Sequence, residues 1–108
     1  MATGILGTAD LAAATLATVY TVPDDTFCVA SVSVVNRGNT SIGIRIAVAA
    51  SDTPTDAEWL EFDTPLDAKG VLERTGMVLQ AGKKIVVRST AINANAVAFG
   101  IETSVPAA

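Results

Sequence analysis

Two stretches of the sequence alternate strictly between two sets of side chains, and this pattern limits the possible folds more than any other feature. The first stretch would place on one face Cys28, Ala30, Val32 and Val34. The second would place on one face Ile42, Ile44, Ile46 and Val48. Successive side chains point to opposite sides of a β-strand, so a sustained period of two predicts half-buried strands rather than helices. We therefore expect an all-β protein.

Turn signals divide the β-prone sequence into about seven strands, at a spacing that is typical of sandwiches. Turns are indicated at 23–25, 37–39 and 81–83, where proline, glycine, asparagine or aspartate occur. The predicted strands are 13–22, 27–36, 42–50, 58–63, 70–79, 83–90 and 95–103. This arrangement favours a single-domain antiparallel β-sandwich of the jelly-roll or immunoglobulin-like type.

The two ends of the chain lack the alternating pattern. We expect residues 1–10 to form an N-terminal arm and residues 104–108 to form a C-terminal tail, with the β-sandwich domain covering 11–103. Near the start of this domain, Leu11–Ala17 could also begin a helix. The ends are apolar, with Ile5 and Leu6 in the arm, so they are candidates for contact with a partner.

One polar segment, Ser51–Ala57, breaks the regular spacing of strands and turns. It is predicted to be a loop or a single helical turn. Ser51 or Thr53 would be the N-cap, and Pro54 would occupy the first helical position, where its missing N–H costs nothing.

The composition argues against most enzyme classes. The chain has no histidine, which removes the commonest general base, and its single cysteine cannot form an internal disulfide. The net charge of −4 lacks the basic footprint of a nucleic-acid-binding protein. We therefore expect a protein that is not an enzyme and that needs no cofactor, metal, nucleic acid or small-molecule substrate.

The same composition favours assembly with other protein subunits. Hydrophobic residues make up 50% of the chain and charged residues only 17%. The sequence contains no run of about 18 consecutive apolar residues, so we expect no membrane-spanning helix. The first residues also lack the basic region of a secretory signal. A chain this apolar that stays out of the membrane would hide much of its surface against partners, including copies of itself.

Acidic side chains occur in three groups, namely Asp24 with Asp25, Asp52 with Asp56 and Glu58, and Glu61 with Asp63. None has the ligand density or the turning glycine of a calcium loop, so solvated carboxylates and caps are the favoured interpretation. Glu61 and Asp63 would share the outer face of a strand, with Leu60 and Phe62 pointing inward. A small hydrolase that uses such a carboxylate pair is a third alternative.

A few residues are candidates for an interface. Trp59 lies beside the polar loop, where a core anchor or a subunit contact is favoured over a platform for sugar. Glu73 and Arg74 are adjacent on a predicted strand, so one of them must point inward or toward a partner and be paired there. Cys28, on an apolar strand with no nearby base, is interpreted as a small buried hydrophobe.

Several segments together resemble a family of small structural proteins of tailed-bacteriophage virions, and they cover residues 17 to about 102. These segments are Ala17–Pro23, Val35–Gly38, Ile44–Ala47, Ser51–Pro54, Glu58–Asp63, Gly70–Gly76 and Leu79–Val87. The chain departs from the family's Pro-Ala-Gly-Lys turn at 23–26, where it has Pro-Asp-Asp-Thr. The resemblance implies a β-sandwich module of a virion and carries over no binding residue.

The resemblance and the composition together predict a capsid decoration (cement) protein. Such a protein would bind the major capsid protein across capsomer seams on the virion surface, after assembly in the host cytoplasm, and would self-associate, with a homotrimer as one arrangement. The candidate contact residues are Ile5, Leu6, Trp59, Glu73, Arg74 and Pro106. The alternative is a tail- or fibre-associated adhesin domain that contacts a glycan of the host surface.

Overall fold

The two alternating stretches form strands, as predicted, and their apolar faces point into the protein. The structure is a computed structural model in which residues 3–105 are described. Strand β3 (Thr26–Asn36) buries Cys28 and every second residue after it, and strand β4 (Ile42–Ala49) buries Ile42, Ile44 and Ile46. The period of two therefore identified the core faces of these strands.

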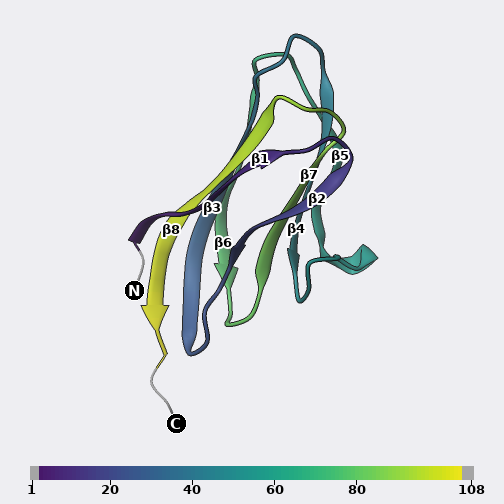
Figure 1. The fold of residues 1–108 in the computed structure, drawn as a ribbon. Helices are drawn as coiled ribbons and strands as arrows, with labels where there is room; N and C mark the ends of the chain where they lie inside the picture. Colours follow the sequence, from purple (N-terminus) through teal and green to yellow (C-terminus); the bar gives the residue numbers. More distant parts are fainter. Residues whose placement is uncertain (1–2, 106–108) are drawn as a thin grey trace.

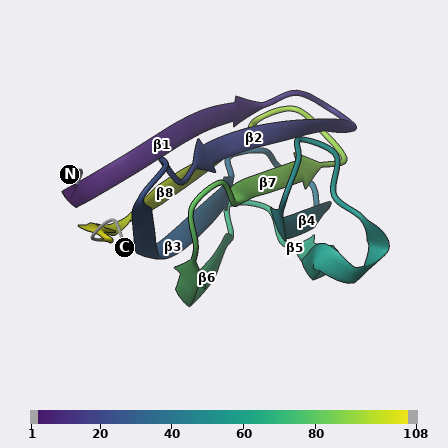
Figure 2. The same ribbon diagram turned by 90° about the horizontal axis from the view of Figure 1, so that it is seen from below.

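Eight strands are present in the described part of the chain, one more than predicted. Besides β3 and β4 they are β1 (Thr3–Leu11), β2 (Thr15–Thr21), β5 (Trp59–Leu66), β6 (Val71–Leu79), β7 (Lys84–Ser89) and β8 (Ala94–Ser104). They form two four-stranded antiparallel sheets that face each other, as Figures 1 and 2 show. We call β1-β8-β3-β6 the first sheet and β2-β7-β4-β5 the second sheet.

The strand pairs follow a simple rule. Strand β1 pairs with β8, β2 with β7, β3 with β6 and β4 with β5, and all four pairs are antiparallel. This set of pairs results when the chain folds back on itself between β4 and β5, so that its two halves form a long antiparallel ribbon. The ribbon is then rolled up into the sandwich. The additional pairs β3·β8 and β4·β7 join the rolled ribbon into the two sheets.

The core between the sheets combines a row of small side chains on β8 with larger, mostly branched ones on the neighbouring and facing strands. Strand β8 contributes Ala94, Ala96 and Ala98, all fully buried. The second sheet fills the space opposite with larger residues, among them Ile44 and Ile85. Small residues on one sheet allow the two backbones to approach closely while large ones keep the packing dense.

The N-terminal segment corrects a prediction. Residues 1–10 were expected to be an arm outside the domain, but Thr3–Leu11 is a strand that pairs with β8 over its whole length. The alternation was hidden because Leu6 is an extra residue in a β-bulge, which moves the apolar side chains out of phase. The strand predicted at 13–22 is present as β2 (Thr15–Thr21), so the alternative of a helix that begins within 11–17 is excluded.

The polar segment after β4 contains the expected single helical turn, but its start is shifted. The short 3-10 helix η1 covers Asp56–Glu58, and its N-cap is Thr55 rather than Ser51 or Thr53. The backbone N–H of Thr55 donates a hydrogen bond to the Glu58 carboxylate, which is why the turn begins there.

Every edge strand carries a β-bulge, whereas the central pairs β3·β8 and β4·β7 run without a shift. The bulges lie at Leu6 in β1, Val19 in β2, Leu60 and residues 62–63 in β5, and residues 75–76 in β6. Bulges twist an edge and disrupt its row of free backbone groups, which protects a sheet from pairing with other chains.

Candidate functional site

The outer faces of the two sheets differ in chemistry, and the outer face of the first sheet is the more apolar. It carries a group of large apolar side chains that we call the apolar face: Ile5, Phe27, Val29, Val78 and Ile101 are exposed, and Phe99 is partly buried among them. Val29, Val78 and Ile101 are each about half exposed or more, which is unusual for three neighbouring β-branched residues.

The strand register makes these residues one patch. Val29 of β3 lies opposite Val78 of β6 on one side and Ile101 of β8 on the other. Two residues further along, Phe99 of β8 lies opposite Ile5 of β1. Residues that face each other across strands on the same side of a sheet are in contact range, so the patch runs across all four strands.

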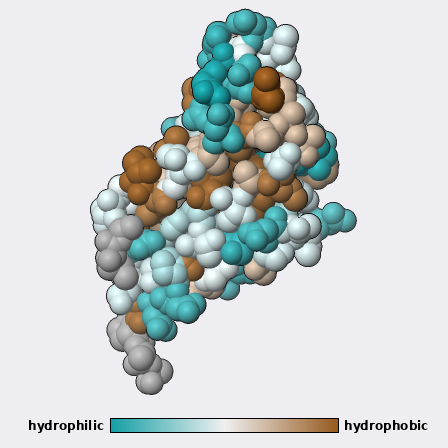
Figure 3. Space-filling view, in the orientation of Figure 1, coloured by the Kyte–Doolittle hydropathy of each residue, from teal (hydrophilic) through white to brown (hydrophobic). Residues whose placement is uncertain are grey.

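Very little charge interrupts this face. Among the outward residues of the four described strands of the first sheet, Asp10 and Glu73 are the charged ones, and both lie toward the end of the sheet away from Val29. Figure 3 shows a related pattern from the side of β1 and β2, where hydrophobic residues form a band across the middle and hydrophilic ones gather at the upper tip. The apolar face is therefore suited to contact with another apolar surface.

The outer face of the second sheet is charged by comparison. Arg45 of β4 lies opposite Arg88 of β7 on this face. Lys84 of β7 hydrogen-bonds to Thr21 and lies 3.8 Å from the Asp52 carboxylate. A surface of this kind remains hydrated at little cost, unlike the face of the first sheet.

On this charged face, a β-bulge gathers an arginine, two aromatic rings and a carboxylate. Ile44 and Ile46 pair with Thr64 and Glu61, so Phe62 and Asp63 both lie opposite Arg45 alone. Asp63 adopts a positive φ of 53°, as the extra residue of such a bulge often does. The bulge thus directs both side chains onto Arg45.

The contacts within this cluster are close. The Arg45 guanidinium donates two hydrogen bonds to the Asp63 carboxylate, at 2.6 and 3.1 Å. Its central carbon lies 3.9 Å from the centre of the Phe62 ring and 5.7 Å from that of Trp59. The hydrogen bonds from Arg45 lower the pKa of Asp63, so both charges persist at neutral pH.

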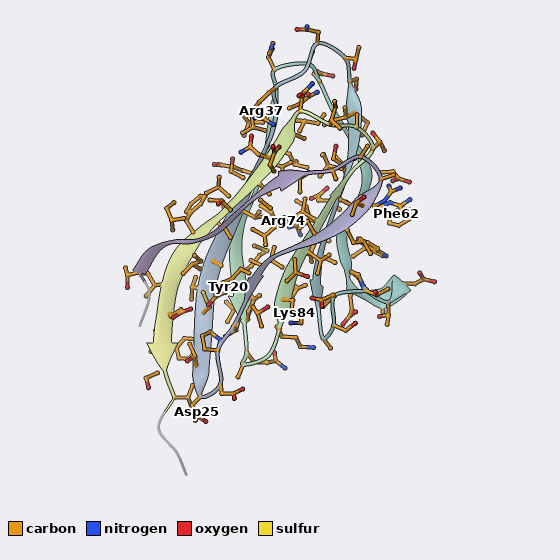
Figure 4. All side chains as sticks on the ribbon, in the orientation of Figure 1. Tyr20, Asp25, Arg37, Phe62, Arg74 and Lys84 are labelled. Carbon is orange, nitrogen blue, oxygen red and sulfur yellow. The ribbon has the colours of Figure 1, made fainter. Side chains whose placement is uncertain are left out.

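A hollow of about 400 Å³ lies beside the two rings and is lined by Asp56, Trp59 and Phe62. The rings are 5.5 Å apart and nearly perpendicular, at 70°. Figure 4 shows Phe62 pointing outward from the second sheet. Asp56 belongs to η1, so the helical turn forms one wall and β5 forms the other.

The loop that forms this wall is held by Glu58. Its carboxylate accepts hydrogen bonds from the backbone N–H groups of Thr55 and Ala50, at 2.8 and 3.0 Å. These backbone hydrogen bonds lower the pKa of Glu58 because they stabilise its charged form. The prediction that a carboxylate of this group acts as a cap agrees with the two hydrogen bonds of Glu58.

The facing of β5 was predicted incorrectly. Leu60 and Phe62 were expected to point inward, but Phe62 is 55% exposed, and Glu61 points toward the interior instead. Two bulges, at 62–63 and at Leu60, explain the inversion, because each extra residue breaks the alternation. Glu61 accepts hydrogen bonds from Arg74 of β6 at 3.0 Å and from Thr64 at 2.9 Å.

The predicted interface residues do not form one site. Ile5 and Glu73 lie on the outer face of the first sheet, whereas Trp59 lies on the second sheet. Leu6 packs against the core, and Arg74 of the edge strand β6 is paired with Glu61 of the edge strand β5. The prediction that one of Glu73 and Arg74 would be paired applies to Arg74. Pro106 lies outside the described residues.

Sequence reasoning missed the strongest surface feature. Val29, Val78 and Ile101 were assigned to strands, but nothing in a single strand indicates that its outer residues will lie next to those of two other strands. The available signal was that the outward side of β3 carries large apolar residues, Phe27, Val29 and Val35, beside Ser31 and Ser33. Val78, beside the buried Met77 and Leu79, gave a similar signal.

Other chemistry is sparse in the part of the chain that is described. Residues 3–105 contain no cluster of three potential metal ligands and no helix long and apolar enough to cross a membrane. Tyr20 of β2 donates a hydrogen bond to Glu102 of β8, which ties the two sheets together. Burial raises the pKa of Cys28, so this thiol is protonated at neutral pH, as expected of a buried hydrophobe.

No protein-family model, curated protein or solved structure matches the chain. The functional argument therefore depends on the surfaces described above and on the resemblance in the sequence.

Proposed function

We propose that the chain is a structural subunit of a bacteriophage virion, a decoration protein that binds the major capsid protein on the outer surface of the shell. The observation that carries the proposal is the apolar face of the first sheet, which has few charges and spans four strands. It offers area for protein contact, whereas a catalytic role has no support in a histidine-free chain.

We further propose that the fold is a jelly roll rather than an immunoglobulin-like sandwich. The support is the strand order, β1-β8-β3-β6 and β2-β7-β4-β5, in which a folded-back double ribbon is rolled into two sheets. Eight-stranded jelly rolls of two Greek keys occur in viral capsid and lectin domains. Because one fold serves many functions, this order supports the proposal only together with the surface chemistry.

The mechanism is burial of the apolar face across a seam between capsomers. Each large aliphatic side chain that is removed from water stabilises the contact by roughly 1.5–3 kcal/mol, before the entropy of association is subtracted. The bulged edge strands discourage open-ended strand pairing, so the face, rather than an edge, makes the contact. Many copies on one shell would add these modest contacts together.

Cryo-electron microscopy of intact particles tests this proposal. We expect regular density of about 11 kDa per copy on the outside of the shell, with the first sheet facing the capsid. Particles reconstituted with the double variant V29T/I101T should show strongly reduced occupancy. The matched control T18S alters the other sheet and should bind normally.

Threonine keeps the β-branched shape, so the double variant should still fold, and circular dichroism checks this. Full occupancy by the folded double variant would contradict the apolar face as the docking surface. Density found at the tail and absent from the shell would contradict decoration and favour the tail- or fibre-associated alternative.

A further inference from the structure

We propose that the hollow between η1 and β5 binds a neutral sugar ring. This site is separate from the apolar face, since it lies on the outer side of the second sheet and involves Asp56, Trp59 and Phe62. It goes beyond the proposed structural role and does not depend on it.

The shape and the lining of the hollow suit a sugar. Trp59 and Phe62 present two rings at 70° to each other, and Phe62 is 55% exposed. The face of an aromatic ring is electronegative and attracts the C–H groups that a pyranose carries on its own faces. The Asp56 carboxylate at the rim can accept hydrogen bonds from the hydroxyl groups at the edge of the sugar.

Arg45 argues against a cationic ligand. Aromatic rings beside a carboxylate can also hold an ammonium group. Here, however, a cation is already in place, because the guanidinium of Arg45 lies 3.9 Å from the centre of the Phe62 ring. A second positive charge would meet repulsion from Arg45 at short range.

The carboxylates argue against an anionic ligand. Asp63 neutralises Arg45 through two hydrogen bonds, so this arginine has little charge left to attract an anion. Asp56 lines the hollow itself, and the whole chain carries a net charge of −4. A ligand without charge, with C–H faces and hydroxyl edges, fits the remaining chemistry.

The site is held in place before any ligand binds. Arg45 is fixed by Asp63, and it fixes the Phe62 ring in turn. Glu58 holds the loop of η1 through two backbone hydrogen bonds, so the wall that carries Asp56 is ordered. Binding therefore needs little conformational ordering, which favours the affinity of a small site.

Trp59 is the single tryptophan of the chain, so its fluorescence reports directly on the hollow. We expect neutral hexasaccharides of glucose, cellohexaose or maltohexaose, to shift the Trp59 emission in a saturable manner, with millimolar affinity. Isothermal titration calorimetry and amide chemical shifts in NMR provide second readouts. The shifts should concentrate on η1 and β5.

Three variants sharpen the test. F62A should lose roughly tenfold in affinity because one ring face is removed, while F62Y should retain binding. D56N should lose less, since the amide oxygen still accepts hydrogen bonds. I92A removes a similarly exposed apolar side chain that does not line the hollow and should bind like the wild type. Circular dichroism confirms that each variant is folded.

Two results would overturn the proposal. One is the absence of any saturable change with both hexasaccharides in fluorescence, calorimetry and NMR. The other is tighter binding of tetramethylammonium or of a sulfated hexasaccharide than of the neutral sugars, which would contradict the charge argument. The V29T/I101T variant should bind sugar normally, because its substitutions lie on the other sheet. Failure of the sugar-binding proposal would therefore not bear on the shell-binding proposal, which the particle experiment tests separately.

Discussion

Asn36 illustrates how much one buried polar residue can determine. It is fully buried at the end of β3, and its side-chain amide donates to the backbone carbonyls of Thr40, Leu66 and Asp67. Its side-chain oxygen accepts a hydrogen bond from the backbone N–H of Gly38. One side chain therefore joins the β3–β4 loop to the β5–β6 loop, which explains a buried amide in an apolar core.

We expect N36A to lower the free energy of unfolding by about 2–3 kcal/mol, because it removes the hydrogen bonds that a fully buried side chain makes to two loops. Urea denaturation followed by Trp59 fluorescence measures this loss. N39A, an exposed neighbour in the same loop, is the matched control and should change stability by less than about 0.5 kcal/mol. Equal stability of the two variants would contradict the role given to Asn36.

Glu58 makes the loop of η1 sensitive to acid. Its pKa is lowered from the ordinary value of 4.5 by backbone hydrogen bonds from Thr55 and Ala50. A lowered pKa in the folded state means that the stabilisation is present above pH 4.5 and is lost as the pH falls through the lowered value. The emission of the adjacent Trp59 should therefore change reversibly below about pH 4.5. E58Q cannot titrate, so its emission should be flat over this range, and an unchanged acid transition in E58Q would assign the transition to another group.

At the scale of elements, the edge strands are where the chain departs from simple alternation. In β5 the bulge places Phe62 and Asp63 on Arg45, and thereby creates the aromatic cluster. In β1 the bulge at Leu6 lets the strand follow β8 while it also packs against β2. Bulges thus protect the edges and at the same time direct side chains.

A substitution at Gly7 tests whether β1 packs closely against β2. A Cβ atom at this residue would lie 2.1 Å from the carbonyl oxygen of Val19, which is a backbone atom and cannot move aside. We expect G7A to reduce stability by about 2–4 kcal/mol and to detach β1 from β2. G43A is the control, since its Cβ would approach a side-chain methyl group of Thr90 at 3.3 Å.

Thermal unfolding and hydrogen exchange measure both variants. Faster exchange of the β1 amides in G7A, with little change in G43A, is the expected pattern. A G7A protein as stable as the wild type would mean that β1 is a loose arm, as the sequence suggested.

At the scale of the whole molecule, two sheets with opposite surface chemistry are held together by the core and by a few cross-sheet contacts. Tyr20 donates a hydrogen bond to Glu102 and so links β2 with β8. The ion pair between Arg74 and Glu61 links the edge strands β6 and β5. The apolar face and the aromatic hollow consequently lie on opposite sides, so a subunit that docks by one face leaves the other exposed.

Cys28 reports on the opening of the whole sandwich, because it is fully buried between the sheets. Burial raises its pKa above the ordinary value of 9.0, which further reduces the reactive thiolate. We expect a thiol reagent to label the folded protein roughly 10³-fold or more slowly than the urea-unfolded chain. The urea dependence of labelling should follow global unfolding seen by Trp59 fluorescence. Fast labelling without urea would indicate local opening at β3.

The sequence by itself determined the strand content, most of the strand positions and the inner faces of β3 and β4, because side-chain alternation is a local property. It also located the capped loop and the buried Cys28. Residue 6 and residues 62–63 could not be identified as bulges, since a bulge exists only relative to a partner strand. For this reason β1 was missed, and Leu60 and Phe62 were assigned to the wrong face.

Only the tertiary structure decided which surfaces exist. Val29, Val78 and Ile101 are far apart in the sequence and become one patch because β3 pairs with both β6 and β8. Likewise, the ring pair at Trp59 acquires Arg45 through the pairing of β4 with β5. Local sequence specifies the face of each strand, but the order of strands in the sheet determines which faces meet.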